Sequence, residues 1–117
     1  MDGYRILVDR LWPRGLSKER AVVDEWLREV APSAALRRWF GHEPARWAEF
    51  KRRYFQELRA EPAATAIARM RTLGARLRVT LLYAARDEVH NNAAALREHL
   101  GPLRRGKPRA AGDDNTG

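Results

Sequence analysis

The sequence predicts a single α/β domain with a small, mostly parallel sheet flanked by helices. Two short apolar runs, YRILV at residues 4–8 and VTLLY at residues 79–83, have the length and residue types of buried strands. Between them, apolar residues recur at spacings of three and four, which is the period of helices that pack on a sheet. A chain of 117 residues has room for one hydrophobic core. We therefore expect one domain over residues 1–100, followed by a tail over residues 101–117.

The segment after the first strand is expected to hold a loop and then a short helix. Pro13 and Gly15 break regular structure, and Ser17 can cap a helix that follows. Four apolar side chains then repeat as on one face of a helix: Val23, Trp26, Leu27 and Val30. The pattern stops at Pro32, so a short helix over residues 23–30 is predicted.

Capping and starting residues predict the next three helices. Ser33 is a typical N-cap for a short helix that ends at Gly41. Pro44 begins a longer helix, and Pro62 begins another that closes near Gly74. The longer helix carries an apolar stripe at helical spacing: Trp47, Phe50, Tyr54 and Leu58.

A last helix is predicted over residues 90–100, after the second strand. Ala94, Leu96 and Leu100 are expected on its inner side. From Gly101 onward the chain is rich in Gly, Pro and charge and has one large apolar residue, Leu103. Such a segment contributes little to a core, so residues 101–117 are expected to be a disordered basic and polar tail.

Composition and missing motifs narrow the classes of partner and chemistry. The formal net charge of +8 attracts a small anionic ligand or nucleic acid. The absence of Cys excludes thiolate nucleophiles. The chain has neither a signal-like start nor an apolar stretch long enough to span a membrane, so we expect a cytoplasmic protein without a membrane partner. His42, His90 and His99 lie far apart without metal-ligand spacing, so no metal is expected. Phosphate-loop, dinucleotide and serine-hydrolase motifs do not occur, and the cofactor is left unknown.

The segment DRLWPRG at residues 9–15 follows the end of the first strand, where open α/β sheets bind ligands. Arg10 and Arg14 can clamp a phosphate or carboxylate, and Trp12 can stack on a planar base. Asp9 can orient the ligand or act as a base. In the alternative interpretation Asp9 pairs with an arginine, Trp12 fills the edge of the core and the rest is a rigid turn.

The segment ARDEVHNN at residues 85–92 follows the second strand and opens a helix, where free N–H groups favour an anion. Its candidates are Arg86, Asp87, His90 and Asn91, of which His90 carries an imidazole, a common general acid or base. In the structural alternative, Asp87 is the helix N-cap, and the two asparagines bond neighbouring backbone groups. Two parallel strands would bring this segment and DRLWPRG to one edge of the sheet.

The segment RRWFGH at residues 37–42 surrounds a helix end with two arginines, Trp39 and His42. Trp39 and Phe40 cannot both point inward, so one aromatic ring beside these cations can be exposed for a nucleobase or a protein surface. The alternative is a Trp39 side chain buried under a loop.

The strings VDRLWPRG, APSAALRRWFGH and LLYAARDEVHNNA, in this order, resemble the YeaO-like family, a bacterial family classed as a domain of unknown function. The resemblance implies a compact α/β domain over roughly residues 3–100. It singles out as motif positions Asp9, Arg10, Trp12, Pro13, Arg14, Gly15, Lys18, Trp39, His42, Asp87, His90 and Asn91. Family members usually begin with an additional stretch that contains a strand, so the first strand here is expected to lie at an exposed sheet edge that favours a homodimer.

Two functions remain open on this reasoning, and whether the protein is an enzyme is undecided. The first is a small-molecule enzyme or binder that recognises a phosphate-bearing or nucleotide-like anion at the carboxyl ends of the strands. Its acid or base candidates are Asp9, Asp87 and His90. Its ligand-binding candidates are Arg10, Trp12, Arg14, Lys18, Trp39, His42, Arg86 and Asn91. The alternative is a non-catalytic nucleic-acid-binding or protein-interaction module.

Overall fold

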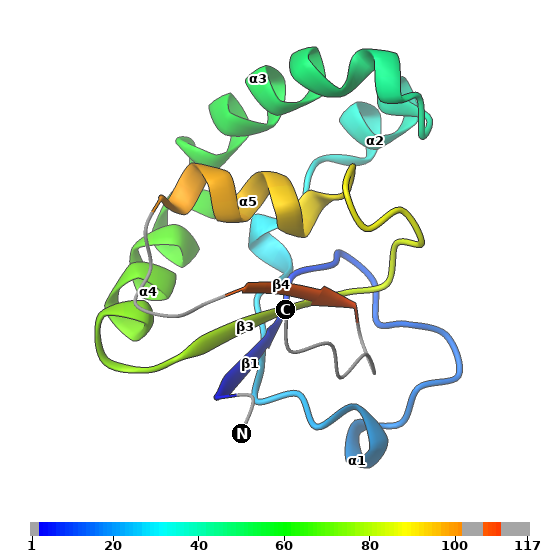
Figure 1. Ribbon diagram of the computed structural model, residues 1–117. Helices are drawn as coiled ribbons and strands as arrows, with labels where there is room; N and C mark the ends of the chain where they lie inside the picture. Colours follow the sequence, from blue (N-terminus) through cyan, green and yellow to red (C-terminus); the bar gives the residue numbers. More distant parts are fainter. Residues whose placement is uncertain (1–2, 102–106, 111–117) are drawn as a thin grey trace.

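A parallel sheet covered by helices forms the framework of the domain, which confirms the α/β class. The computed structural model describes residues 3–101 and 107–110. The sheet has the strand order β2-β1-β3-β4, with every neighbouring pair parallel. The strands are β1 (Tyr4–Leu7), β2 (Glu25–Trp26), β3 (Val79–Tyr83) and β4 (Lys107–Ala110). β1 and β3, the two strands that the sequence predicts, lie side by side at its centre (Figure 1).

The expectation that the first strand lies at an exposed edge is wrong. β1 pairs with β3 on one side and with β2 on the other. Beyond the paired residues, the backbone N–H of Asp24 donates to the carbonyl oxygen of Arg5 (2.9 Å) and that of Leu27 to the carbonyl oxygen of Leu7 (3.0 Å). The expected homodimer edge at β1 is therefore already filled by this chain's own residues.

The prediction of a helix over residues 23–30 is also wrong, because residues of this segment pair with β1 instead. They form β2 followed by a 3₁₀ turn, η1 (Arg28–Val30). The Asp24 carboxylate accepts a hydrogen bond from the backbone N–H of Arg5 (2.8 Å). Leu27 and Val30 are still buried, so a strand and a turn bury the apolar positions that suggested a helix.

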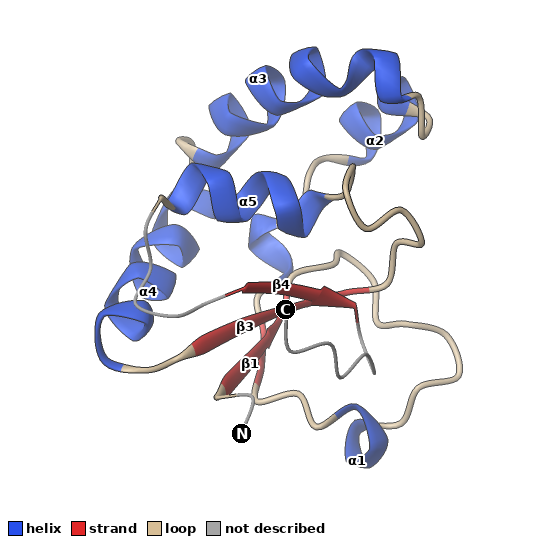
Figure 2. Cartoon of the chain, in the orientation of Figure 1, coloured by secondary structure: helices blue, strands red, loops and turns tan. Residues whose placement is uncertain are grey.

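The other predicted helices are confirmed, with small changes at their ends. They are α2 (Ala34–Phe40), α3 (Trp47–Leu58), α4 (Ala63–Arg76) and α5 (Asn92–Leu100), with a 3₁₀ turn, η2 (Pro44–Arg46), before α3. A further short helix that was not predicted, α1 (Lys18–Ala21), follows the cap candidate Ser17. α4 continues two residues past Gly74, and α5 begins at Asn92 rather than at His90. The helices α2 to α5 lie on one side of the sheet, and α1 lies on the other (Figures 1 and 2).

Part of the predicted tail belongs to the sheet. Residues 107–110 form β4, which pairs with β3 from Thr80 to Tyr83. This differs from the disorder that the composition predicts, because a strand at the open edge of β3 needs backbone pairing rather than apolar side chains. Pro108 is compatible with such an edge strand, since only one side of the strand must donate hydrogen bonds. The remaining tail residues, 102–106 and 111–117, lie outside the described part of the chain.

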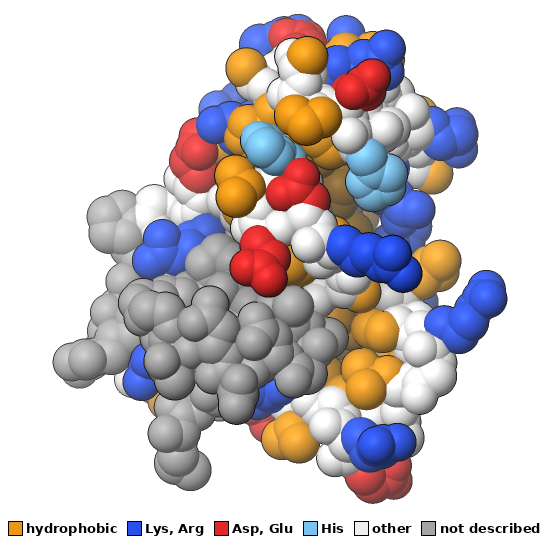
Figure 3. Space-filling view, turned by 45° about the vertical axis from the view of Figure 1, so that its right-hand side comes forward, with side chains coloured by type: hydrophobic (Ala, Val, Ile, Leu, Met, Phe, Trp, Pro, Cys, Tyr) orange, Lys and Arg blue, Asp and Glu red, His pale blue; other side chains and the backbone are white. Residues whose placement is uncertain are grey.

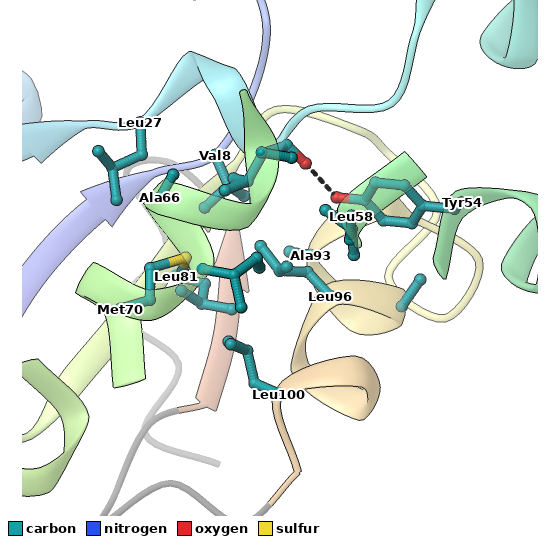
Figure 4. Close-up of a cluster of buried hydrophobic side chains, with 14 of the residues drawn as sticks. Val8, Leu27, Tyr54, Leu58, Ala66, Met70, Leu81, Ala93, Leu96 and Leu100 are labelled. Atoms are coloured by element: carbon teal, nitrogen blue, oxygen red, sulfur yellow. Dashed lines mark hydrogen bonds between the residues drawn. The ribbon is translucent and has the colours of Figure 1, made fainter. Parts of the chain in front are cut away.

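The main core lies between the sheet and the helices. Alternate residues of the central strands face it, including Ile6, Val8 and Leu81, and meet apolar side chains of α3, α4 and α5 (Figure 4). Tyr54 is fully buried and donates a hydrogen bond from its hydroxyl to the carbonyl oxygen of Val30. This bond joins α3 to the turn η1, and so fixes the layer of helices above the carboxyl ends of the strands.

Candidate functional site

The two loops that follow β1 and β3 meet at the carboxyl ends of these strands, as the sequence predicts. Asp9, just after β1, connects them through its carboxylate. Its Oδ2 accepts from the backbone N–H of Ala84 (2.8 Å), and its Oδ1 accepts from Nδ2 of Asn92 (3.2 Å). Asn92 Nδ2 also donates to the carbonyl oxygen of Val8 (3.1 Å). The start of α5 is thereby tied to both central strands.

A pocket of about 460 Å³ opens at this junction. The side of the molecule on which these loops lie carries histidine and cationic side chains next to hydrophobic ones (Figure 3). The lining comes from several separate segments: Asp9, Arg10, Leu11, Trp12, Pro13, Ala31, Pro32, Arg37, Arg38, Phe40, His42, Phe50, Ala84, Ala85, His90, Asn91 and Asn92. Cations, one carboxylate and several aromatic rings thus share one pocket.

The cations at the pocket come chiefly from the end of α2. Ser33 caps this helix by accepting from the N–H of Leu36 (3.1 Å), and Gly41 ends it in the left-handed conformation (φ 54°). Leu36 and Phe40 point into the core, which leaves Arg37 and Arg38 exposed on the helix flank. Within residues 3–101, neither guanidinium has a hydrogen bond or an ion pair with another side chain.

Arg10 and His42 complete the basic lining in different ways. The guanidinium of Arg10 donates to the carbonyl oxygen of Pro32 (3.0 Å), so part of its donor set is already used. His42 follows the cap of α2 with a left-handed backbone (φ 59°) and is exposed. These two residues extend the basic rim that Arg37 and Arg38 provide.

Asp9 is the one carboxylate among the described residues that line the pocket, and its surroundings shift its pKa in opposite directions. Burial raises the pKa of Asp9, whereas the hydrogen bonds from Asn92 and Ala84 and the nearby charge of Arg37 lower it. The net direction is upward. Asp9 has no ion-pair partner at contact distance among the described side chains, so the predicted pairing with an arginine is only a longer-range attraction to Arg37.

Asp87 organises the second loop from outside the pocket lining. Its Oδ1 accepts from the backbone N–H groups of Val89 and His90, both at 2.9 Å, and its Oδ2 lies 3.0 Å from Nδ1 of His90. These bonds lower the pKa of Asp87 to about 2, with the His90 backbone N–H as the largest cause. The role as N-cap that the structural alternative gives to Asp87 belongs instead to Asn91, which accepts from the N–H of Ala94 (2.8 Å).

Two candidate tryptophans lie in different places. Trp12 lines the pocket, donates from its indole to the carbonyl oxygen of Leu16 and packs edge-on against Trp26 with ring centroids 5.5 Å apart. Trp39 is half-buried against the core, outside the pocket, and the guanidinium of Arg53 lies 4.1 Å from its ring centroid. The ring that this pocket offers to a ligand is therefore that of Trp12.

The structure brings together part of the predicted set. Asp9, Arg10, Trp12, His42, His90 and Asn91 line the pocket, whereas Arg14, Trp39, Arg86 and Asp87 do not. The side chain of Lys18 lies outside the described part of the structure. Arg37 and Arg38 replace the missing cations. The helix phase set by Ser33 was a usable signal for them, because it buries Leu36 and Phe40 and leaves both arginines on the flank beside the helix end.

Other site types find no support in the part of the chain that the structure covers. Among its residues, no three His, Asp or Glu side chains lie close enough together to hold a metal ion. None of its helices has the length and apolar character needed to span a bilayer.

Comparison with known proteins confirms the resemblance to the YeaO-like family. Residues 1–112 match a family model, DUF488-N3i, described as the inactive DUF488-N3 subclade. Protein YeaO of Escherichia coli is 40% identical over 102 residues, which cover 87% of each chain. Protein Rv3073c of Mycobacterium tuberculosis is 42% identical over 99 residues, covering 85% of this chain and 81% of its own. Both carry the description "uncharacterized", and no solved structure matches.

Proposed function

Since this chain belongs to the DUF488-N3i family, the inactive DUF488-N3 subclade, we propose that it is a non-catalytic protein that binds a small phosphate-bearing or nucleotide-like anion in the pocket at the ends of β1 and β3. The observation that carries the proposal is the pair Arg37 and Arg38, which line the pocket without a partner among the described side chains. Guanidinium groups bind phosphate and carboxylate oxygens through paired, charge-assisted hydrogen bonds.

The size and walls of the pocket suit a nucleotide-sized anion. Its volume of about 460 Å³ lies within the range of small-molecule sites. Trp12 supplies partly exposed aromatic surface beside the cations, so a planar group has an apolar wall to contact, whereas Phe40 and Phe50 in the lining are 8% and 3% exposed and add little to it. A partly aromatic pocket of this volume favours a compact ligand over the extended backbone of a nucleic acid.

The position of Asp87 argues against its use as a catalytic base. Its Oδ1 accepts hydrogen bonds from the backbone N–H groups of Val89 and His90, and its Oδ2 lies 3.0 Å from Nδ1 of His90. A general base needs to lie within reach of the proton it removes and to have a pKa suited to the task. Asp87 has a pKa of about 2 and lies outside the pocket lining, which makes it a poor base at neutral pH.

The proposal is tested by measuring binding of AMP, ribose 5-phosphate and inorganic phosphate to the full chain by calorimetry, with Arg37→Ala as the test variant. Loss of one charge-assisted interaction is expected to weaken binding about tenfold or more. Arg76→Ala is the matched control, because it removes the same charge from an exposed position at the end of α4 that does not line the pocket.

The outcomes separate the two functions that the sequence leaves open. Saturable binding of a small phosphate compound that Arg37→Ala weakens and Arg76→Ala does not supports the pocket. Binding of oligonucleotides alone, weakening steeply with salt and by similar amounts in both variants, would contradict it and favour the nucleic-acid module.

A further inference from the structure

We propose that the ligand of this pocket is a nucleotide whose base carries an amino group, and that the Asp9 carboxylate accepts a hydrogen bond from that group. This inference rests on the proposed anion-binding function and adds the chemistry of the ligand's other end. It makes Asp9 the residue that distinguishes aminated bases from bases that lack the amine.

The lining of the pocket carries charges of both signs. Arg37 and Arg38 supply positive charge from the end of α2, while Asp9 supplies negative charge from the end of β1. Inorganic phosphate would gain from the arginines but would be repelled by the carboxylate. A ligand with an anionic group at one end and N–H donors at the other satisfies both.

Asp9 is held in place with acceptor capacity to spare. The N–H of Ala84 and the amide of Asn92 each occupy one of its oxygens, at 2.8 and 3.2 Å. A carboxylate offers about four lone-pair directions, so roughly two remain for a ligand. The two protein bonds fix the orientation of the carboxylate before any ligand enters, which lowers the ordering cost of binding.

Each oxygen of Asp9 has one protein donor, and the pocket offers room for a further donor beside this carboxylate. Burial raises its pKa, and no described cation lies within ion-pair distance of it. A partly buried carboxylate gains most from an additional hydrogen-bond donor, because the surrounding protein screens the interaction less than water does. An exocyclic amino group is such a donor.

The neighbouring walls favour a base over an aliphatic amine. The partly exposed ring of Trp12 lines the same pocket as Asp9, and the lining residues Phe40 and Phe50 are buried. A flat heteroaromatic ring can cover a tryptophan ring with one face while its edge presents N–H groups to a carboxylate. A flexible ammonium group would bond the carboxylate but leave the aromatic surface uncovered.

The test compares two nucleotide pairs that differ in a single amino group. AMP is compared with purine riboside 5′-monophosphate, and CMP with zebularine 5′-monophosphate, by calorimetry on the full-length wild-type chain. We expect the aminated member of at least one pair to bind about tenfold more tightly, as for one hydrogen bond to a charged group. Ribose 5-phosphate measures the anion end alone.

Asp9→Asn then assigns the preference to this side chain. The variant keeps the size of the side chain and an oxygen that can accept from Ala84, although it removes the acceptor of Asn92 Nδ2. The preference for the aminated member of a pair should fall below about twofold. Glu88→Gln is the matched control: it removes an exposed carboxylate of the neighbouring loop that does not line the pocket, and should keep the preference.

The failures of the two proposals are distinguishable. Equal binding within both pairs, with ribose 5-phosphate still bound, would overturn the role of Asp9 and leave the anion site intact. Absence of binding by every nucleotide and by ribose 5-phosphate would overturn both. The wild-type comparison decides the question even if Asp9→Asn does not fold.

Discussion

Asp9 and Asp87 hold the two loops of the pocket in different ways, although each lies shortly after a central strand. Asp9 is partly buried and connects elements far apart in the sequence, through Ala84 and Asn92. Within the described residues, the carboxylate of Asp87 accepts hydrogen bonds from its own loop, from the backbone N–H groups of Val89 and His90. The first carboxylate therefore positions two segments relative to each other, and the second shapes one of them.

The loop bonds of Asp87 predict a measurable titration. Its pKa of about 2 lies below the ordinary value of 3.8, so the ionised carboxylate stabilises the folded loop above about pH 4, and this stabilisation is lost as the pH falls toward 2. In His90→Ala we expect the pKa to stay lowered, because the backbone N–H groups of residues 90 and 89 are its largest causes. NMR titration of the Asp87 carboxyl carbon measures this pKa in the wild-type chain and in His90→Ala. A midpoint near 3.8 in the wild-type chain would mean that these bonds do not form.

At the scale of elements, capping residues predicted most of the helices. Ser33 and Gly41 bound α2, and Pro44 and Pro62 precede α3 and α4, because these residues act through local backbone geometry that the sequence states directly. β2 was not predicted, since a strand of two residues exists only through its pairing with β1. β4 was missed for the same reason: its polar sequence carries no sign of the open edge of β3.

Gly3, the residue directly before β1, gives a prediction about the stability of the central strand pair. Gly3 has a positive φ of 76°, and a Cβ there would lie 2.3 Å from the backbone oxygen of Arg78, which also accepts from the N–H of Tyr4. Gly3→Ala is therefore expected to lower the free energy of unfolding by about 2–3 kcal/mol, because neither strand can move away without breaking the β1–β3 pairing.

Gly15→Ala is the matched control for that variant. Gly15 has a similar φ of 78°, but no atom lies within 4 Å of where its Cβ would be. Only the left-handed backbone then opposes the substitution, at about 1 kcal/mol. Urea denaturation measures both changes. Equal effects of the two substitutions would show that the close approach to Arg78 does not govern the cost.

At the scale of the whole molecule, the pocket depends on bringing distant segments together. The meeting of the DRLWPRG and ARDEVHNN segments was predictable, because two buried strands in parallel place their ends at one edge. The helix phase places Arg37 and Arg38 on the flank of α2, but the sequence does not say that this flank faces the pocket, since that depends on how α2 docks over the sheet edge. Tertiary contacts fix that docking: the carboxylate of Glu57, for example, accepts hydrogen bonds from the backbone N–H and the hydroxyl of Ser33.

Chemical-shift mapping tests most directly whether a small phosphate-bearing anion binds where these segments meet. The measurement is a titration of the isotopically labelled full chain with AMP at 0.15 and 0.4 M salt, followed through backbone amide signals. We predict saturable shifts in residues 9–12, 37–42 and 84–92 at both salt concentrations, with α4 unchanged. Shifts spread over the arginines of α4, or shifts that vanish at the higher salt, would contradict a pocket and indicate nonspecific attraction to the basic surface.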